Sequence, residues 1–215
     1  MYRFDEWIFT PQRAAFHVPT ATMVVADLHL GYQETRRKKG EAVPLWSTEE
    51  LLSPLVAVLA VHKVTNLVIA GDLFESSPGE NSLREFQTWC SDCRIRLSAL
   101  IPGNHDLHWI HGEHDLPIVS EGVTLGRWTI VHGHTRLPKC PVMHGHIHPC
   151  FRLSDGVSAP CYLLSDSRIV LPAFTEDAAG ENVLKRRKWS RYQALVCLPD
   201  KVLDFGEVGR MQAKT

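Results

Sequence analysis

The chain has 215 residues, of which 44% are hydrophobic, and its formal net charge is −1; this length suits one domain with a sizeable core over residues 1–215. The lack of a basic excess argues against strong non-specific nucleic-acid binding, and no stretch approaches the roughly 18 consecutive apolar residues of a membrane span. Residues 1–7 show no basic segment followed by an apolar one, so we expect no signal peptide and a cytoplasmic protein.

Four short apolar runs, rich in β-branched residues, are each followed at once by polar residues. The runs are 22–26, 67–71, 100–103 and 128–131. This pattern is typical of a buried strand whose carboxyl end opens into a functional loop. Because ligands in α/β proteins gather at the carboxyl ends of strands, we expect the polar residues after these runs to meet at one end of a sheet.

Two helices are predicted between the first strands. Residues 47–62 open with a Ser-Thr-Glu-Glu sequence that resembles a capping box. Since proline is poorly tolerated in a helix interior, we expect Ser53 to cap a restarted helix with Pro54 in its first turn. Residues 81–89 predict a second helix, with three large apolar residues on one face: Leu83, Phe86 and Trp89.

The later part of the chain favours antiparallel strands. They are expected at residues 122–132, 159–170 and 192–208, with turn signals at Asp166-Ser167 and Pro199-Asp200. Strands that alternate with helices early, followed by β-rich sequence, predict an α/β fold with two sheets and helices outside.

Five short motifs carry residues with metal-binding chemistry. In chain order they are Asp27-Leu28-His29, Gly71-Asp72, Gly103-Asn104-His105-Asp106, Val131-His132-Gly133 and Gly145-His146-Ile147-His148. Each motif alone is common by chance. Together they offer carboxylate, amide and imidazole donors and no thiolate, a set that suits divalent Mn, Fe or Zn and argues against a cysteine-based structural zinc.

In this order the motifs resemble those of the calcineurin-like metallophosphoesterase superfamily, and every motif position is filled. Residues 25–31 and 71–74, with Leu171-Pro172-Ala173-Phe174, further resemble the small bacterial and archaeal group that includes ligase-associated DNA damage response endonucleases. That group tends to have a glycine-rich stretch after the last motif, whereas residues 175–180 here read TEDAAG. The resemblance implies a single metallophosphoesterase domain, a four-layer α/β/β/α sandwich of two mixed β-sheets flanked by helices.

The resemblance also implies a cofactor of two divalent metal ions, manganese before iron or zinc. One ion would have four ligands, Asp27, His29, Asp72 and His148. The other would have Asp72, which bridges the ions, and three more, Asn104, His132 and His146. A hydroxide shared by both ions would attack the phosphorus in line. His105 would stabilise charge or protonate the leaving oxygen, and Asp106 would accept a hydrogen bond from His105 and fix its tautomer.

These features favour a phosphodiesterase whose phosphoester substrate is a nucleotide or nucleic acid. A hydrolase of lipid-linked nucleotide pyrophosphates or of phosphomonoesters is the alternative; residues 71–75 fit the pyrophosphate group too, although that group tends to carry Arg at the position of His105. A non-catalytic metal-binding scaffold is the third hypothesis, and such proteins tend to lack the histidine that His105 supplies here.

Residues outside the motifs leave alternatives open. The basic runs 36–39 and 185–188 fit either a solvated face or contact with a phosphate backbone, the second run with Trp189 stacking on a base. Cys90 and Cys93 form a lone C-x-x-C that we expect to be reduced, with a zinc or redox site as the alternative. The candidate substrate-binding residues are His134, Arg36 and Arg37.

Overall fold

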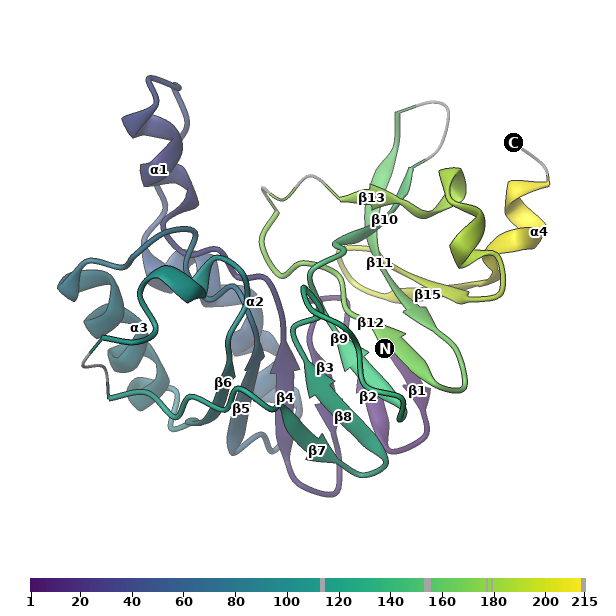
Figure 1. The fold of residues 1–215 in the computed structure, drawn as a ribbon, viewed down its shortest axis with the longest axis horizontal. Helices are drawn as coiled ribbons and strands as arrows, with labels where there is room; N and C mark the ends of the chain where they lie inside the picture. The colour runs from purple at the N-terminus through teal and green to yellow at the C-terminus, as the bar shows by residue number, and fades with distance from the viewer. Residues whose placement is uncertain (113–114, 153–155, 177, 179, 214–215) are drawn as a thin grey trace.

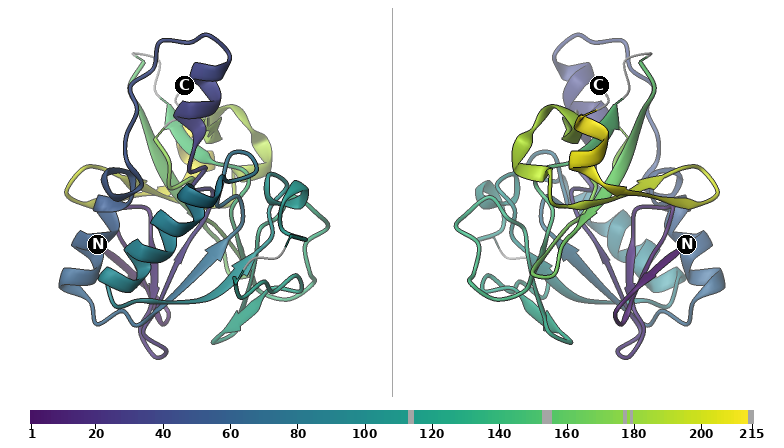
Figure 2. Two further views of the ribbon diagram at one scale, coloured as in Figure 1. Left: turned by 90° about the vertical axis from the view of Figure 1, so that its left-hand side faces the viewer. Right: turned by 90° about the vertical axis from the view of Figure 1, so that its right-hand side faces the viewer.

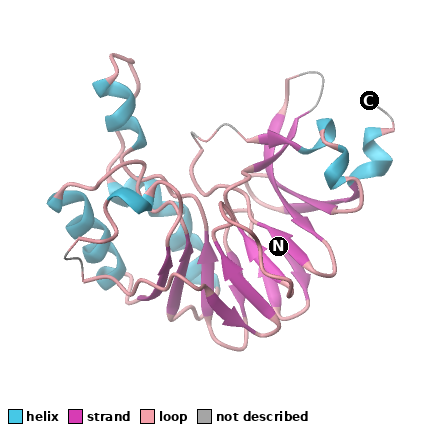
Figure 3. Ribbon diagram, viewed as in Figure 1, coloured by secondary structure: helices cyan, strands magenta, loops and turns pink. Residues whose placement is uncertain are grey.

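Two β-sheets pack face to face, and helices lie on the outer side of each (Figure 1). Figure 3 shows the strands in the middle of the molecule and the helices at its two sides. The computed structural model describes residues 1–112, 115–152, 156–176, 178 and 180–213. This arrangement is the α/β fold of two mixed sheets flanked by helices that the sequence predicts.

The first sheet has six strands in chain order. They are β1 (Tyr2–Phe4), β2 (Trp7–Phe9), β3 (Ala15–His17), β4 (Thr22–Val25), β5 (Asn66–Ala70) and β6 (Arg96–Ile101). Strands β1 to β4 are antiparallel, whereas β4, β5 and β6 are parallel. Parallel neighbours need a crossover connection, which α2 (Thr48–Val61) and α3 (Glu80–Asp92) supply. The carboxyl ends of β4, β5 and β6 therefore lie along one edge.

The second sheet has nine strands. They are β7 (Val123–Leu125), β8 (Trp128–Val131), β9 (Val142–His144), β10 (Pro149–Arg152), β11 (Ser158–Leu164), β12 (Arg168–Val170), β13 (Glu181–Asn182), β14 (Gln193–Cys197) and β15 (Val202–Glu207). The predicted antiparallel pairs β7–β8, β11–β12 and β14–β15 are confirmed.

The prediction that four polar strand ends share one sheet was wrong. Strand β8 lies in the second sheet, because it pairs with its hairpin partner β7 and with the parallel strand β9. The residues that follow β8 and β9 therefore approach those that follow β4 and β5 from the opposite sheet.

Alternating side chains build a core on each side of the first sheet. Val24 of β4 faces the second sheet, where it joins Trp128 and Tyr162. Met23 and Val25 face the helices in a second core. The outer face of the second sheet is covered by two 3-10 turns, Val183–Lys185 and Arg187–Trp189, and by α4 (Val208–Gln212). Successive side chains of a strand point to opposite faces, and in these strands both sets are apolar. The strands are therefore buried on both faces.

Helix α2 runs unbroken from Thr48 to Val61 with Pro54 inside it, so the predicted restart at Ser53 was wrong. Proline lacks the N–H that would donate to the carbonyl of Glu50. The Ser53 hydroxyl donates to that carbonyl instead, at 2.8 Å, which keeps the acceptor satisfied. The predicted capping box at Ser47 and Glu50 is confirmed.

Helix α3 confirms the second predicted helix and buries Phe86 and Trp89 against the first sheet. Cys93 caps its carboxyl end. Burial raises the pKa of the Cys90 thiol to about 12, which disfavours the thiolate that zinc or redox chemistry requires.

Helix α1 (Tyr32–Lys38) projects from the body of the molecule (Figures 1 and 2). It was not predicted from the sequence, and its last turn carries the basic residues Arg36, Arg37 and Lys38. Among the described residues, no helix has the length and apolar character needed to cross a membrane.

Candidate metal centre

The loops that follow β4 and β5 run side by side. The Asp27 N–H donates to the Gly71 carbonyl and the His29 N–H to the Asp72 carbonyl, both at 3.0 Å. These bonds continue the parallel pairing of β4 and β5 beyond the strands themselves. They fix Asp27 and His29 beside Asp72, at the edge where the parallel strands end.

The loop after β9 approaches Asp27 from the second sheet. The His146 N–H donates to both carboxylate oxygens of Asp27, at 3.1 and 2.9 Å. A Cβ on Gly145 would lie 2.4 Å from the Asp27 carboxylate, so only glycine permits this approach. The sequence after β9 therefore brings His146 and His148 to the end of β4.

The segment Leu171-Pro172-Ala173-Phe174 links the two sheets next to this loop. The Leu171 N–H donates to the His144 carbonyl of β9 at 2.7 Å, and the Phe174 N–H donates to the Ala26 carbonyl after β4 at 2.9 Å. The segment thus connects the ends of the two strands that carry the ligand loops.

The candidate donor atoms in the described part of the chain gather in three groups. Donors of Asp27, His29 and His148 lie within 4.8 Å of one another, and so do donors of a second group: Asp72, His132 and His146. His29 and Asp72 also form such a group with His105. The Asn104 amide oxygen lies 3.2 Å from Nε2 of His132. All the residues proposed as metal ligands therefore meet in one place.

Hydrogen bonds orient the buried imidazoles. Nδ1 of His132 lies 2.9 Å from the Ala70 carbonyl, which can only accept, so Nδ1 carries the proton and Nε2 faces Asp72 at 3.3 Å. Nδ1 of His29 pairs with the Glu75 carboxylate at 2.8 Å. Its buried Nε2 has no hydrogen-bond partner among the described residues and lies 3.9 Å from the Asp72 carboxylate. Metal-binding histidines are typically fixed in this way through the other ring nitrogen.

The backbone is strained at the candidate ligands. Left-handed φ angles occur at five of them: Asp27 (56°), His29 (49°), Asp72 (52°), His146 (68°) and His148 (49°). Such conformations cost about 1–3 kcal/mol each outside glycine and persist at functional sites where the surroundings impose them. The strain therefore accords with a site built for ligand geometry rather than for stability.

Electrostatics keep the central carboxylate charged. Burial opposes ionisation, but the hydrogen bond and charge of His132, the His105 N–H and the charge of His29 together lower the pKa of Asp72 to about 2. Burial likewise opposes the charged form of His132, and its contacts with Asp72 and Asp27 raise its pKa above the usual range. Asp72 is thus an anionic donor at neutral pH.

These residues fit a divalent metal ion. Nε2 of His29 is buried and makes no hydrogen bond within the described part of the chain, so it is available to bind a metal ion. The surrounding side chains offer carboxylate, amide and imidazole ligands. The set is that of Mn, Fe or Zn rather than of a thiolate site. The ligand division given by the motifs remains our proposal for how the ions are held.

Glu75 was missed as a site residue, although it follows the Gly-Asp motif closely. Its carboxylate pairs with His29, and its backbone carbonyl lies 2.9 Å from Nδ1 of His105. The Glu75 carboxylate lies 3.5 Å from the same nitrogen. Glu75 therefore orients both a candidate ligand and the candidate acid, a role that no spacing rule in the sequence could reveal.

The predicted hydrogen bond from His105 to Asp106 was wrong. Asp106 is fully buried and accepts backbone N–H groups from Asp72 at 2.8 Å, Leu73 at 3.2 Å and Gly103 at 2.8 Å. Its carboxylate is thus used to hold the turn that carries Asp72 against the turn after β6. Burial raises the pKa of Asp106 in spite of these bonds.

Replacing Asp106 with alanine should destabilise the fold by roughly 3–5 kcal/mol, because buried N–H groups lose their acceptor. Urea denaturation of this variant and of the exposed control Asp92→Ala measures the difference. Equal midpoints for the two variants would contradict the role given to Asp106.

The candidate substrate-binding residues lie in different surroundings. Arg36 pairs with Glu41 and with the Tyr32 hydroxyl, whereas Arg37 is exposed on α1. The His134 ring centroid lies 5.2 Å from that of His132, which places it beside the ligand group.

Trp189 cannot stack on a base as the second basic run suggested. It is 3% exposed, and its indole N–H donates to Glu181 at 2.6 Å. Glu181 also pairs with Lys188 at 3.0 Å. Packing of the 3-10 turns against the second sheet explains this burial, which removes Trp189 from the substrate surface.

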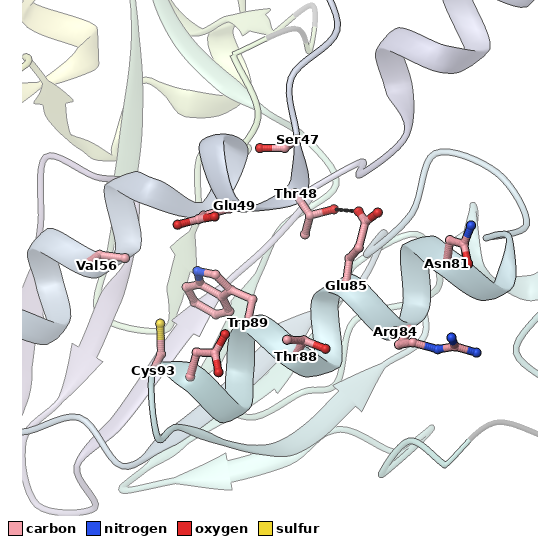
Figure 4. Close-up of a pocket in the computed structure, with 11 residues that line it drawn as sticks. Ser47, Thr48, Glu49, Val56, Asn81, Arg84, Glu85, Thr88, Trp89 and Cys93 are labelled. Atoms are coloured by element: carbon pink, nitrogen blue, oxygen red, sulfur yellow. Dashed lines mark hydrogen bonds between the residues drawn. The ribbon is translucent and has the colours of Figure 1, made fainter.

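A separate cavity of about 510 Å³ lies between α2 and α3 (Figure 4). Trp89 and Cys93 line it, and the Thr48 hydroxyl donates to Glu85 at its edge, at 2.8 Å. None of the candidate ligands lines it, so it is not part of the candidate metal centre.

Comparisons with known proteins agree with this geometry. A family model described as calcineurin-like phosphoesterase matches residues 21–158. Among solved structures, the crystal structure of Pseudomonas putida nuclease MPE is similar, with a TM-score of 0.76 and 23% sequence identity over 95% of this chain and 100% of that one. No curated protein matches. The structural likeness shows a shared fold, and the matched residues contain all five motifs.

Proposed function

Because the chain belongs to the calcineurin-like phosphoesterase family, we propose that this metal-dependent phosphoester hydrolase is a phosphodiesterase for a nucleotide or nucleic acid. A similar structure that is called a nuclease, aligned over its whole length, supports this substrate class. We further propose two manganese ions as the cofactor, and residues 1–215 as one domain whose sheets both supply ligands. The motifs favour the group that includes ligase-associated endonucleases.

The position of His105 is the observation that best supports a catalytic function. Its ring meets the His29 ring edge to face, with centroids 4.8 Å apart, and its side chain is 34% exposed. The Glu75 carbonyl occupies Nδ1, so Nε2 is the nitrogen available to a substrate. A scaffold protein has no need of an imidazole held in this way beside the ligand groups.

The metal ions and the surrounding side chains would have different roles in hydrolysis. When bound, divalent ions would polarise the phosphoryl group and lower the pKa of the attacking water. Asp106 accepts the N–H groups of Asp72 and Gly103, and Asp72 accepts the His105 N–H, which keeps the Asp72 carboxylate and His105 in fixed relation. Glu75 pairs with the His105 ring while that ring is protonated. His105 would then donate the Nε2 proton to the leaving oxygen and become neutral, with its remaining proton on Nδ1 beside the Glu75 carbonyl.

Hydrolysis of bis-p-nitrophenyl phosphate and of p-nitrophenyl phosphate, on metal-stripped protein with manganese restored, tests the proposal. We expect preference for the diester. Preference for the monoester would indicate a phosphatase instead. Activity on lipid-linked nucleotide pyrophosphates alone would indicate a hydrolase of those pyrophosphates. Activity on none of these, with two metal ions bound, would favour the non-catalytic scaffold.

A further inference from the structure

Trp46 is the one exposed tryptophan of the chain, whose six tryptophans all lie in the described part. Half of its side chain is exposed, whereas the other five are at most 6% exposed. Leaving a large aromatic side chain in water forgoes the free energy of its burial. A single exposed apolar side chain is ordinary in itself, so a ligand-binding role for Trp46 depends on the cavity that it lines.

Trp46 lines a cavity whose wall includes residues of the first ligand loop. The cavity has a volume of about 240 Å³, and Leu28 and Leu30, the neighbours of His29, form part of its wall. Thr175 also lines it, and the Thr175 N–H donates to the Asp27 carbonyl at 3.3 Å. The cavity wall therefore includes sequence neighbours of two candidate metal ligands, Asp27 and His29.

A second, more polar cavity is lined by a candidate metal ligand. Its volume is about 280 Å³, and His148 and Arg152 line it. The two cavities share Arg13, Thr175 and Glu176. The largely buried Arg13 is held there by the Thr175 carbonyl at 3.1 Å and by Glu176 at 2.9 Å. Arg13, paired with Glu176, thus forms part of the wall of both cavities, one lined by Trp46 and the other by the candidate ligand His148.

We propose that the cavity lined by Trp46 binds a nucleobase of the substrate, while the sugar-phosphate chain passes Arg13 to reach the metal centre beside His148. This inference rests on the proposed function and names the part of the substrate that the site recognises. A base stacks on an indole ring because every base has a π-face, and a guanidinium attracts phosphate. The base must be unpaired to enter the cavity.

Kinetics of Trp46→Ala test the subsite with two substrates, an oligonucleotide and an oligomer of the same length in which abasic sites replace the bases. We expect KM for the oligonucleotide to rise roughly 5- to 150-fold, with KM for the abasic oligomer unchanged. Trp46→Phe should restore most of the affinity. Leu45→Ala, an equally exposed neighbour that does not line the cavity, should resemble the wild type. Equal changes with both substrates, or none, would overturn the subsite.

Fluorescence gives a second readout that needs no turnover. In the metal-loaded His105→Ala variant, oligothymidylate should quench the solvent-exposed emission, and the abasic oligomer should not. The Trp46→Phe, His105→Ala double variant should show no such quenching. Absence of quenching in the single variant would overturn the subsite. If the wild type cleaves no diester but quenching occurs, the proposed function fails while the base-binding site stands.

Discussion

Replacing Asp72 with alanine should remove both metal ions and lower turnover by roughly 10³-fold or more, because metal ions supply several kcal/mol of transition-state stabilisation. Asp72 is 2% exposed and shares a donor group with His132 and His146, and another with His29 and His105. It also accepts the His105 N–H at 2.8 Å. The Asp72→Ala variant therefore lacks the carboxylate that these two donor groups share. Metal analysis of the purified variant measures the effect.

Asp72→Asn serves as the matched variant for this experiment. The amide keeps the shape of the side chain and an acceptor for the His105 N–H, but it loses the charge that a bridging ligand needs. We expect this variant to fold like the wild type and still to lack a full metal complement. Two metal ions retained in Asp72→Ala would refute the bridging role.

Replacing His105 with alanine should leave metal content unchanged and lower turnover by roughly 10²–10⁴-fold, the range typical of a general acid or base. The side chain is partly exposed and is held by Glu75 rather than by the core, so the fold should persist. Steady-state turnover together with metal analysis separates an acid from a ligand.

His108→Ala is the control, since this histidine is exposed in the same segment. We expect it to leave turnover and metal content at the wild-type values. Unchanged turnover in His105→Ala would remove His105 from the mechanism. Loss of metal from that variant would instead make His105 a ligand, as its grouping with His29 and Asp72 allows.

Much of the fold was predictable because periodicity and turn residues act locally. The parallel strands β4 and β5, the helix α3 and the antiparallel pairs of the second sheet all follow patterns of the chain itself. The division of strands between two sheets was not predictable, because β8 could pair with any neighbour and only tertiary packing selects β9. The continuity of α2 through Pro54 was not predictable either. It depends on the Ser53 hydroxyl, which donates to the Glu50 carbonyl in place of the missing proline N–H.

The candidate ligands were predictable from motif order, but the residues that hold them were not. Asp106 follows His105 directly, yet its carboxylate turns to the backbone of Asp72 and Leu73. Glu75 lies 46 residues from His29 in sequence and contacts it at 2.8 Å. Hydrogen bonds of this kind depend on how two loops cross, which adjacency in sequence does not determine.

Anomalous scattering from a manganese-loaded crystal tests the central claim most directly. We expect two strong peaks, one at the group formed by Asp27, His29 and His148 and one at the group formed by Asp72, His132 and His146. A single peak, or peaks away from these side chains, would contradict a two-metal centre.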